Sequence, residues 1–173
     1  MSPNRSATIR KSGKRAIVTG GATGIGYGIA KRFIAEGARV IITDIDNPGG
    51  IAAAEVLGLN CEFVHHDVSV PADWDRVFAV AADRFFGLDI MVNVAGVTLM
   101  GNIEQLDVDT WDKTMAINVR SCFLGCQGAI KAMKSDGGGS IINMASVSAF
   151  RPQAELVAYN ASKAGVDIMT KSV

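Results

Sequence analysis

Short runs of β-branched and other apolar residues alternate along the chain with longer segments in which apolar residues recur every three or four positions. The runs predict strands at residues 16–19, 38–44, 61–66, 88–94 and 140–145. The periodic segments predict helices at residues 24–36, 51–57, 71–86 and 109–133. This alternation is typical of a parallel sheet that is covered by helices on both faces.

Several predicted helices carry start or stop signals. In the first, Ile25, Ile29 and Phe33 share one face, and Gly37 stands where a helix C-cap is expected. Before the third, Ser69 and Pro71 are the residue types typical of an N-cap and of the first helical position. These signals favour amphipathic helices that pack on the sheet.

Right-handed crossovers between the predicted elements give the strand order 3-2-1-4-5. The fold class is therefore α/β, a doubly wound, Rossmann-like parallel sheet. Ligands of such sheets bind in the crevice beyond the carboxyl ends of the strands. The candidate functional residues of this chain fall at or beyond those ends.

Composition narrows the classes of partner. The 173 residues are 49% hydrophobic and 20% charged, which is enough for one buried core. The 17 basic and 17 acidic residues cancel, which gives no electrostatic reason to expect nucleic acid. No apolar run is long enough to cross a membrane. We therefore expect small molecules, or further copies of the chain, as partners.

The chain is expected to form one domain. Residues 1–13 read as a basic flexible tail, although a basic stretch without acids is also a weak feature of organelle-targeting segments. Residues 14–173 are expected to form a single nucleotide-binding domain. Cys61, Cys122 and Cys126 are odd in number and lack metal-ligand spacing, which favours a reducing compartment and a cytoplasmic location.

A glycine-rich segment links the first predicted strand to the first predicted helix. Glycines there let backbone N–H groups approach a pyrophosphate at the helix N-terminus, although a tight turn alone would also use them. The setting within a βαβ unit favours a dinucleotide. The candidate cofactor-binding residues of this segment are Gly20, Thr23, Gly24, Ile25 and Gly26.

Asp44 closes the second predicted strand, where a carboxylate hydrogen-bonds ribose hydroxyls and rejects a 2′-phosphate. The alternative is a solvated carboxylate at a strand end. Two like charges about 4 Å apart repel by about 4 kcal/mol at an effective dielectric constant near 20. Ala22 and Thr23 offer no basic compensation, so the predicted cofactor is NAD rather than NADP.

Further candidates follow the third and fourth strands. Asp67 and Val68 are placed to meet the adenine, and the segment with Asn93, Ala95 and Gly96 lets the cofactor lie against backbone. His65 and His66 point to opposite faces of a strand, so they do not readily share a metal ion, and we interpret them as structural.

Tyr159 and Lys163 stand four residues apart, which places them on one helix face, and Ser146 lies thirteen residues before Tyr159. A phenol has a pKa near 10, so bringing it to about 7.5 requires about 3.4 kcal/mol of preferential phenolate stabilisation. An ammonium together with a positive nicotinamide, each about 4 to 6 Å away, supplies an energy of that order.

The glycine-rich turn, the segment that begins at Asn93, and the set of Ser146, Tyr159 and Lys163 follow one another along the chain. In this order they resemble the short-chain dehydrogenase/reductase family, and the resemblance spans residues 14–173. Val94 stands where the family usually has a second asparagine. Family members continue beyond this length, so we expect a C-terminally truncated chain that lacks the last strands. The motifs that carry the resemblance are Thr19-Gly20-x3-Gly24-x-Gly26, Asn93-x-Ala95-Gly96, Asn118, Ser146 and Tyr159-x3-Lys163.

The resemblance implies four catalytic residues. Tyr159 would be the general acid/base, Lys163 would stabilise its phenolate and hold the nicotinamide ribose, and Ser146 would hydrogen-bond the substrate oxygen. In the family, an asparagine such as Asn118 lies at a helix distortion and anchors a water. Packing or capping roles remain the alternative for each residue taken singly.

Two functions stay open at this stage. The first is an oxidoreductase that transfers a hydride between NAD(H) and a secondary alcohol or ketone. The second is a truncated, catalytically impaired module that binds NAD or self-associates, since Ile141, Ile142 and Met144 would lie on an unprotected sheet edge. The resemblance also implies a homo-oligomer, a dimer or tetramer, that pairs through the helices with Asn118 and Tyr159.

Overall fold

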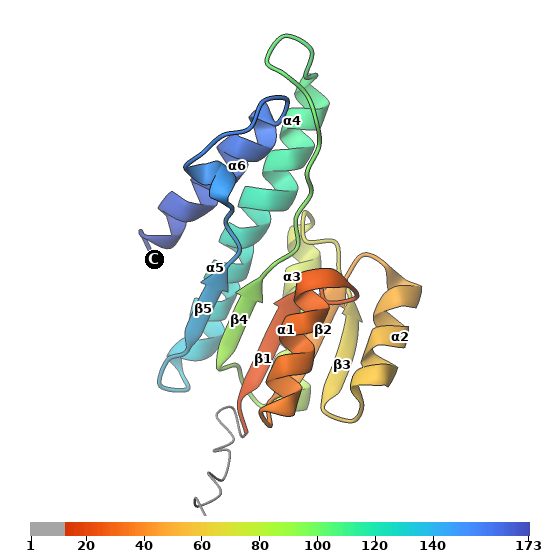
Figure 1. The fold of residues 1–173 in the computed structure, drawn as a ribbon. Coiled ribbons are helices and arrows are strands. Elements are labelled where there is room, and N and C mark those ends of the chain that lie inside the picture. Colours follow the sequence, from red (N-terminus) through yellow and green to blue (C-terminus); the bar gives the residue numbers. More distant parts are fainter. Residues whose placement is uncertain (1–12) are drawn as a thin grey trace, which may run out of the picture.

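The apolar runs form one parallel sheet. The computed structural model describes residues 13–173, so the predicted basic tail lies almost wholly outside the described residues. The strand order is β3-β2-β1-β4-β5, as predicted (Figure 1). In chain order, the strands are β1 (Arg15–Thr19), β2 (Arg39–Asp44), β3 (Cys61–His65), β4 (Ile90–Asn93) and β5 (Ser140–Asn143).

Helices cover both faces of this sheet. Helices α1 and α2 pack on one face, whereas α3 and α5 pack on the other, where α6 joins α5 (Figure 1). The α-helices are α1 (Gly24–Ala35), α2 (Asn47–Leu57), α3 (Pro71–Val80), α4 (Val108–Met115), α5 (Ser121–Lys134) and α6 (Val157–Thr170).

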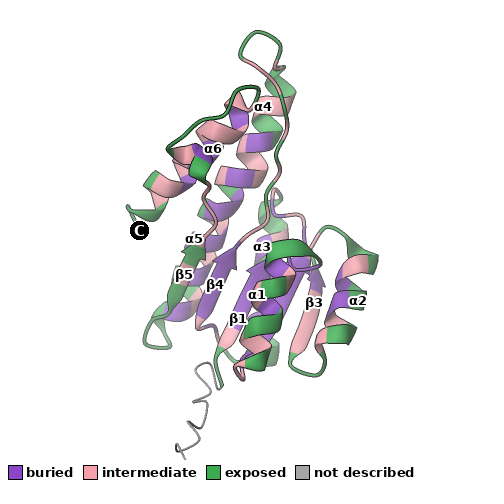
Figure 2. Ribbon diagram, viewed as in Figure 1, coloured by how far each residue is buried: buried purple, intermediate pink, exposed green. Residues whose placement is uncertain are grey.

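Side chains of the central strands alternate between two buried clusters, because successive residues of a strand point to opposite faces. Ala16 and Val18 of β1 face α1 and α2, whereas Ile17 between them faces α3 and α5. Both faces are therefore apolar, and the strands at the centre of the sheet are almost wholly buried (Figure 2). The same alternation determines which side chains at the strand ends point into the candidate site.

Two helices contain a wide π-helical turn that the hydrophobic pattern did not predict, although the resemblance implied a helix distortion at Asn118. The expected helix at residues 109–133 consists of α4, a π-helical turn at Ala116–Arg120, and α5. A second turn of this type, Ala81–Phe85, follows α3. One extra residue in such a turn shifts the helix phase, and α5 continues beyond the first turn. The helix that begins as α3 ends with the second turn, because Phe86 is left-handed.

Several predicted boundaries were wrong by a few residues. Helix α2 begins at Asn47 rather than after Gly50, because Asp46 caps it by accepting a hydrogen bond of 3.1 Å from Gly49 N. Ser69 is not the N-cap of α3; that position belongs to Val70. Ile25 does not face the core but is 63% exposed at the start of α1.

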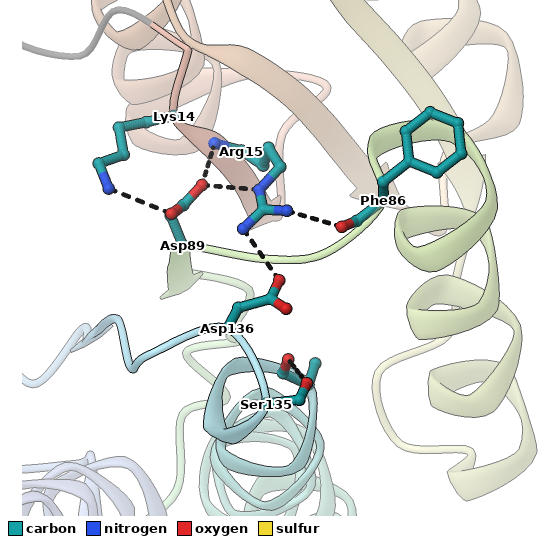
Figure 3. A network of polar contacts seen from close by, with 7 residues as sticks. Lys14, Arg15, Phe86, Asp89, Ser135 and Asp136 are labelled. Atoms are coloured by element: carbon teal, nitrogen blue, oxygen red, sulfur yellow. Dashed lines mark hydrogen bonds and ion pairs between the residues drawn. The ribbon is translucent and has the colours of Figure 1, made fainter.

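The amino ends of β1 and β4 are joined by an ion-pair network (Figure 3). Arg15 Nε and the backbone N of Arg15 donate to Asp89 Oδ2 at 2.8 and 2.9 Å. The same guanidinium bonds the Phe86 carbonyl and the Asp136 carboxylate, and Lys14 bonds the other Asp89 oxygen. This network lies at the sheet end opposite the candidate site.

Strand β5 forms one edge of the sheet among residues 13–173, and its residues are half-buried or exposed (Figure 2). Ile142, an apolar residue of this edge, is 45% exposed. In the described part of the chain, no helix combines the length and the apolar character needed to cross a membrane.

Candidate active site

A cavity of about 400 Å³ lies at the carboxyl ends of β1 to β4. It contains the predicted residues of the glycine-rich turn, Asp44, Asp67, Val68, Ala95 and Gly96. Its walls also include residues that the sequence analysis did not select. The full lining is Gly20, Thr23, Gly24, Ile25, Gly26, Asp44, Ile45, His66, Asp67, Val68, Val94, Ala95, Gly96, Val97 and Ile117.

Close backbone packing explains two glycines of the turn. A Cβ atom at Gly26 would lie 2.0 Å from the carbonyl oxygen of Gly20, so no other residue fits there without a shift. Gly20 has a φ of 66°, and its Cβ would lie 3.1 Å from Ala95 Cα. The turn, the first residues of α1 and the segment after β4 are therefore packed backbone to backbone at the cavity floor.

The N-terminus of α1 suits an anionic ligand. Thr23, its N-cap residue, makes no side-chain capping bond, and the first turn contains no acidic residue. The first N–H groups of the helix and its dipole therefore favour negative charge at this point. Gly24 has a φ of 56° and open space where a Cβ atom would stand, which leaves room for a ligand.

Asp44 is held at the cavity wall by two backbone donors. Its Oδ2 accepts a hydrogen bond of 3.1 Å from Ala22 N in the glycine-rich turn, and its Oδ1 accepts one of 3.1 Å from Asp46 N. Each oxygen keeps further acceptor capacity. The carboxylate thus lies where it can accept hydrogen bonds from a ribose bound between the turn and β2.

The segments after β3 and β4 are also fixed by short polar contacts. Asp67 Oδ1 accepts hydrogen bonds from the backbone N and the hydroxyl of Ser69, at 2.9 and 2.7 Å. The buried Thr19 Oγ1 accepts from Val94 N and Ala95 N at 3.0 and 3.1 Å. These contacts hold the backbone that lines the cavity opposite α1.

Asn93 differs from the other candidates because its side chain points away from the cavity. It lies on the strand face toward α5, and its Nδ2 donates a hydrogen bond of 2.8 Å to Asn143 Oδ1 on β5. A Cβ atom at Gly125 of α5 would lie 2.2 Å from Asn93 Oδ1. Among the predicted residues of this segment, Ala95 and Gly96 line the cavity, whereas the Asn93 side chain joins β4 to β5.

Asn118 lies in the π-helical turn between α4 and α5 and is almost fully buried. Its Oδ1 accepts from Val97 N at 2.8 Å, and its Nδ2 donates to Val97 O and to Ser162 Oγ, each at 2.9 Å. The amide therefore joins the segment after β4 to helix α6. The helix distortion expected at Asn118 is present.

Lys163 of α6 is buried, with its ammonium close to the tyrosine ring. Its Nζ donates a hydrogen bond of 2.7 Å to the carbonyl of Met144 and lies 5.8 Å from the centre of the Tyr159 ring. Burial lowers the pKa of Lys163, while interactions with Tyr159 and Cys122 oppose that shift. A Cβ atom at Gly96 would lie 3.5 Å from this Nζ, so the lysine reaches the cavity wall.

Ser146 begins the short 3₁₀ turn Val147–Ala149 that precedes α6 in the chain, and its Oγ accepts a hydrogen bond of 3.2 Å from Ser148 N. It follows Met144 by two residues, and Met144 binds Lys163. The segment after β5 is therefore tied to α6 at Met144, and the 3₁₀ turn that follows Ser146 also packs against α6.

The structure thus places ten predicted cofactor residues in the cavity and Lys163 beside it, whereas Asn93 faces α5. Tyr159, also a predicted cofactor residue, is not part of the cavity lining. The lining residues that the sequence analysis missed are Ile45, His66, Val94, Val97 and Ile117. Each of them directly adjoins a predicted residue in the chain, and Val94 lies inside the segment already singled out. The available signal was therefore position beside a predicted site residue rather than residue type.

A five-stranded parallel sheet with this order and with helices on both faces is a doubly wound, Rossmann-like α/β fold. The family described as short chain dehydrogenase matches residues 14–173, and the chain belongs to this family.

Curated relatives are similar over nearly the whole chain. A 3-beta-hydroxysteroid dehydrogenase of Comamonas testosteroni is 44% identical over 95% of this chain and 65% of its own length. An NADP-dependent (R)-specific alcohol dehydrogenase of Lentilactobacillus kefiri is 41% identical over 95% of this chain and 67% of its own. A D-beta-hydroxybutyrate dehydrogenase of Rhizobium meliloti is 39% identical over 92% of this chain and 64% of its own. The chain thus spans about two thirds of the length of these relatives.

Proposed function

We propose that this protein is an oxidoreductase that transfers a hydride between NAD(H) and a secondary alcohol or ketone. One observation carries the proposal. The buried ammonium of Lys163 lies beside Tyr159 on one side and beside the cavity wall at Gly96 on the other. An acid/base pair therefore adjoins a cavity with the features of a dinucleotide site. The dehydrogenase names of the relatives support the same reaction class.

The cavity residues fit a dinucleotide in separate parts. The pyrophosphate would lie at the N-terminus of α1, where Gly24 leaves open space and no acid opposes it. Asp44 would accept hydrogen bonds from the adenosine ribose, and Asp67 and Val68 would line the base. A bound nicotinamide supplies the hydride acceptor or donor.

The proton is moved by this chain's own residues. The Tyr159 hydroxyl would take the alcohol proton during oxidation and return it during reduction. Lys163, held by Met144, would keep a positive charge beside the phenolate. The Ser146 hydroxyl would hydrogen-bond the substrate oxygen as its charge develops. Asn118 would fix the relative position of α6 and the cavity wall through Ser162 and Val97.

Asp44 is the basis for proposing NAD rather than NADP. A 2′-phosphate near its carboxylate would meet a like charge, and none of the residues that line the cavity is Lys or Arg. One relative is named as NADP-dependent, so membership of the family does not decide the cofactor. The proposal rests on this one side chain.

The test combines NADH binding, followed by fluorescence, with turnover on a panel of secondary alcohols and ketones. Tyr159→Phe should abolish turnover and leave NADH affinity unchanged. Tyr27→Phe, at the chain's other tyrosine, removes the same hydroxyl from α1 outside the cavity lining and serves as the matched control. Full activity of Tyr159→Phe would contradict the assignment of the general acid/base.

A second candidate is an NAD-binding or self-associating module without catalysis. The half-exposed β5 edge, with Ile142 45% exposed, favours it, because an open strand edge is a template for pairing. NADH binding without turnover, together with dimers or tetramers in ultracentrifugation, would support this candidate. The homo-oligomer and the cytoplasmic location stay predictions.

A further inference from the structure

Ser162 is a fully buried polar residue of α6 that directly precedes Lys163. Its Oγ donates a hydrogen bond of 2.7 Å to the carbonyl oxygen of Tyr159, three residues earlier in the helix. The same Oγ accepts a hydrogen bond of 2.9 Å from Asn118 Nδ2. A serine in a helix is commonly satisfied by its bond to the preceding turn alone, so the bond from Asn118 is a link that helix formation does not require.

The donors and acceptors around the Asn118 amide fix its orientation. The backbone N–H of Val97 can only donate, so the amide atom that faces it at 2.8 Å is Oδ1. Nδ2 then has one hydrogen for the Val97 carbonyl and one for Ser162 Oγ, each at 2.9 Å. The one hydroxyl hydrogen of Ser162 goes to the Tyr159 carbonyl. Every hydrogen in this set of bonds therefore has an acceptor.

These bonds connect the cavity wall to the backbone of Tyr159. Val97 lines the cavity, and the π-helical turn with Asn118 packs against α6 (Figure 1). The path from Val97 through Asn118 and Ser162 to Tyr159 consists of hydrogen bonds of 2.7 to 2.9 Å, and both Asn118 and Ser162 are shielded from solvent. Such a path fixes the position of the Tyr159 backbone relative to the cavity wall.

We propose that Ser162 is a positioning residue for the reaction, whose hydroxyl holds the turn of α6 with Tyr159 and Lys163 in a fixed place relative to the cavity wall. The inference rests on the proposed function. Ser162 acts through the Tyr159 backbone and is given no contact with substrate or cofactor. Displacement of a reacting group by about 1 Å can cost about a hundredfold in rate, so a hydroxyl remote from the chemistry affects kcat.

The start of α6 is also held by backbone hydrogen bonds that do not involve Ser162. Gly101 N donates to Glu155 O at 2.7 Å, and Val157 N donates to Gly101 O at 3.3 Å. The helix start therefore stays attached to the segment after β4 when the Ser162 hydroxyl is removed. We expect loss of this hydroxyl to displace the turn with Tyr159 rather than to unfold it.

Three variants separate positioning from folding. Ser162→Ala removes both hydrogen bonds of the hydroxyl, whereas Ser162→Thr keeps a hydroxyl that can bond the preceding turn. Ser172→Ala is the matched control, because Ser172 Oγ donates at 3.0 Å to the Ile168 carbonyl, a bond of similar kind at the other end of α6. We expect kcat per NADH-binding site to fall about tenfold or more in Ser162→Ala and to return to within about threefold of wild type in Ser162→Thr. Ser172→Ala should keep the wild-type kcat, and the Kd for NADH should stay within about twofold in all three.

An NMR measurement tests the inference without turnover. Protein labelled with ¹³C-tyrosine has two tyrosines, Tyr27 and Tyr159. Saturating NADH should shift the Tyr159 ring resonances in the wild type and in Ser172→Ala, and Ser162→Ala should lose most of this shift although it binds NADH.

The outcomes distinguish the inference from the proposed function. A wild-type kcat in Ser162→Ala, an NADH-induced Tyr159 shift equal to that of the wild type, or equal impairment in Ser162→Thr would overturn the inference and leave the proposed function intact. A wild-type protein that binds NADH without turnover would contradict the proposed reaction, and the ring resonances would then decide the inference. Absence of NADH binding in the wild type would contradict both.

Discussion

Lys163 Nζ donates a hydrogen bond of 2.7 Å to the carbonyl oxygen of Met144, which follows β5 directly. This bond ties the helix that carries Tyr159 to the carboxyl edge of the sheet. Because the lysine is buried, its ammonium meets little solvent screening on the side that faces the tyrosine ring. The position of Tyr159 relative to the cavity thus depends on the buried ammonium of Lys163, which its hydrogen bond to Met144 keeps in place.

Replacement of Lys163 by methionine should therefore lower kcat/KM at pH 7 by about a hundredfold or more and move the pH profile to higher pH, because the phenolate loses its neighbouring charge. Since burial disfavours the ammonium, the thermal midpoint should stay level or rise. Lys171→Met, at an exposed lysine after the same helix, is the control and should keep the wild-type profile. An unshifted profile in Lys163→Met would exclude this role.

Asp44→Asn tests the choice between the two cofactors. The variant keeps an acceptor for the Ala22 N–H but loses the negative charge at the cavity wall. We expect the ratio of the NADPH Kd to the NADH Kd to fall by about tenfold or more, since repulsion of the 2′-phosphate disappears. Asp46→Asn removes a neighbouring charge outside the cavity lining and should leave the ratio unchanged. Equal effects of the two variants would mean that only net charge matters.

The fold was largely predictable because it depends on the period of the hydrophobic pattern and on the handedness of the crossover connections. Hydrophobic runs marked the strands, and right-handed crossovers then left one order for five parallel strands, which the sheet has. Asp44 and Gly26 were predictable as well, because a strand end and a tight turn each demand particular chemistry. Such features depend on a few neighbouring residues of the chain.

Other features depended on contacts between distant segments. Asn93 points to α5 because of its strand face, and its bond to Asn143 joins residues far apart in the chain. The contact of His66 with Thr43 joins the end of β3 to β2, so nothing local in the sequence indicates it. The hydrophobic pattern did not mark the π-helical turn at Ala116–Arg120, and only the resemblance implied a helix distortion at Asn118.

Two glycines of α1, Gly26 and Gly28, provide a test variant and a control variant for the close packing of the glycine-rich turn. Gly26→Ala would place a Cβ atom 2.0 Å from the Gly20 carbonyl oxygen, whereas a Cβ atom at Gly28 meets nothing within 4 Å. We expect Gly26→Ala to lose NADH binding and to lower stability. Gly28→Ala should raise the free energy of unfolding by up to about 1 kcal/mol through helix propensity. Thermal unfolding and NADH titration measure both, and unimpaired binding by Gly26→Ala would contradict the packing argument.

Asp89 links stability to pH at the opposite end of the sheet. Burial tends to raise the pKa of Asp89, but hydrogen bonds from Arg15 and Lys14 outweigh it and bring the pKa to about 2 (Figure 3). A depressed folded-state pKa gives stability that is complete above the unfolded value near 3.9 and is lost as pH falls toward 2. The contribution of this carboxylate to the free energy of unfolding is about 2 kcal/mol.

Asp89→Asn should accordingly lower the free energy of unfolding at pH 7 and flatten its decline below about pH 4. Urea unfolding at a series of pH values measures this directly. Asp83→Asn is the control, because Asp83 lies on the π-helical turn before β4 with a side chain that is 80% exposed. A pH dependence of Asp89→Asn parallel to that of the wild type would show that the Arg15 network does not carry the effect.

Glu155 precedes α6 with a φ of 60°, a left-handed conformation that is unfavourable for a residue with a Cβ atom. Its carbonyl accepts a hydrogen bond of 2.7 Å from Gly101 N, which holds the segments before α4 and α6 together. Glu155→Gly should stabilise the protein by about 0.5 to 1 kcal/mol, because relief of the strain exceeds the entropy that glycine loses on folding. Glu155→Ala keeps the Cβ atom and should bring no such gain. Urea midpoints at constant m-value measure the difference. An equal rise in the free energy of unfolding of both variants would mean that removal of the glutamate charge, rather than relief of backbone strain, is the cause.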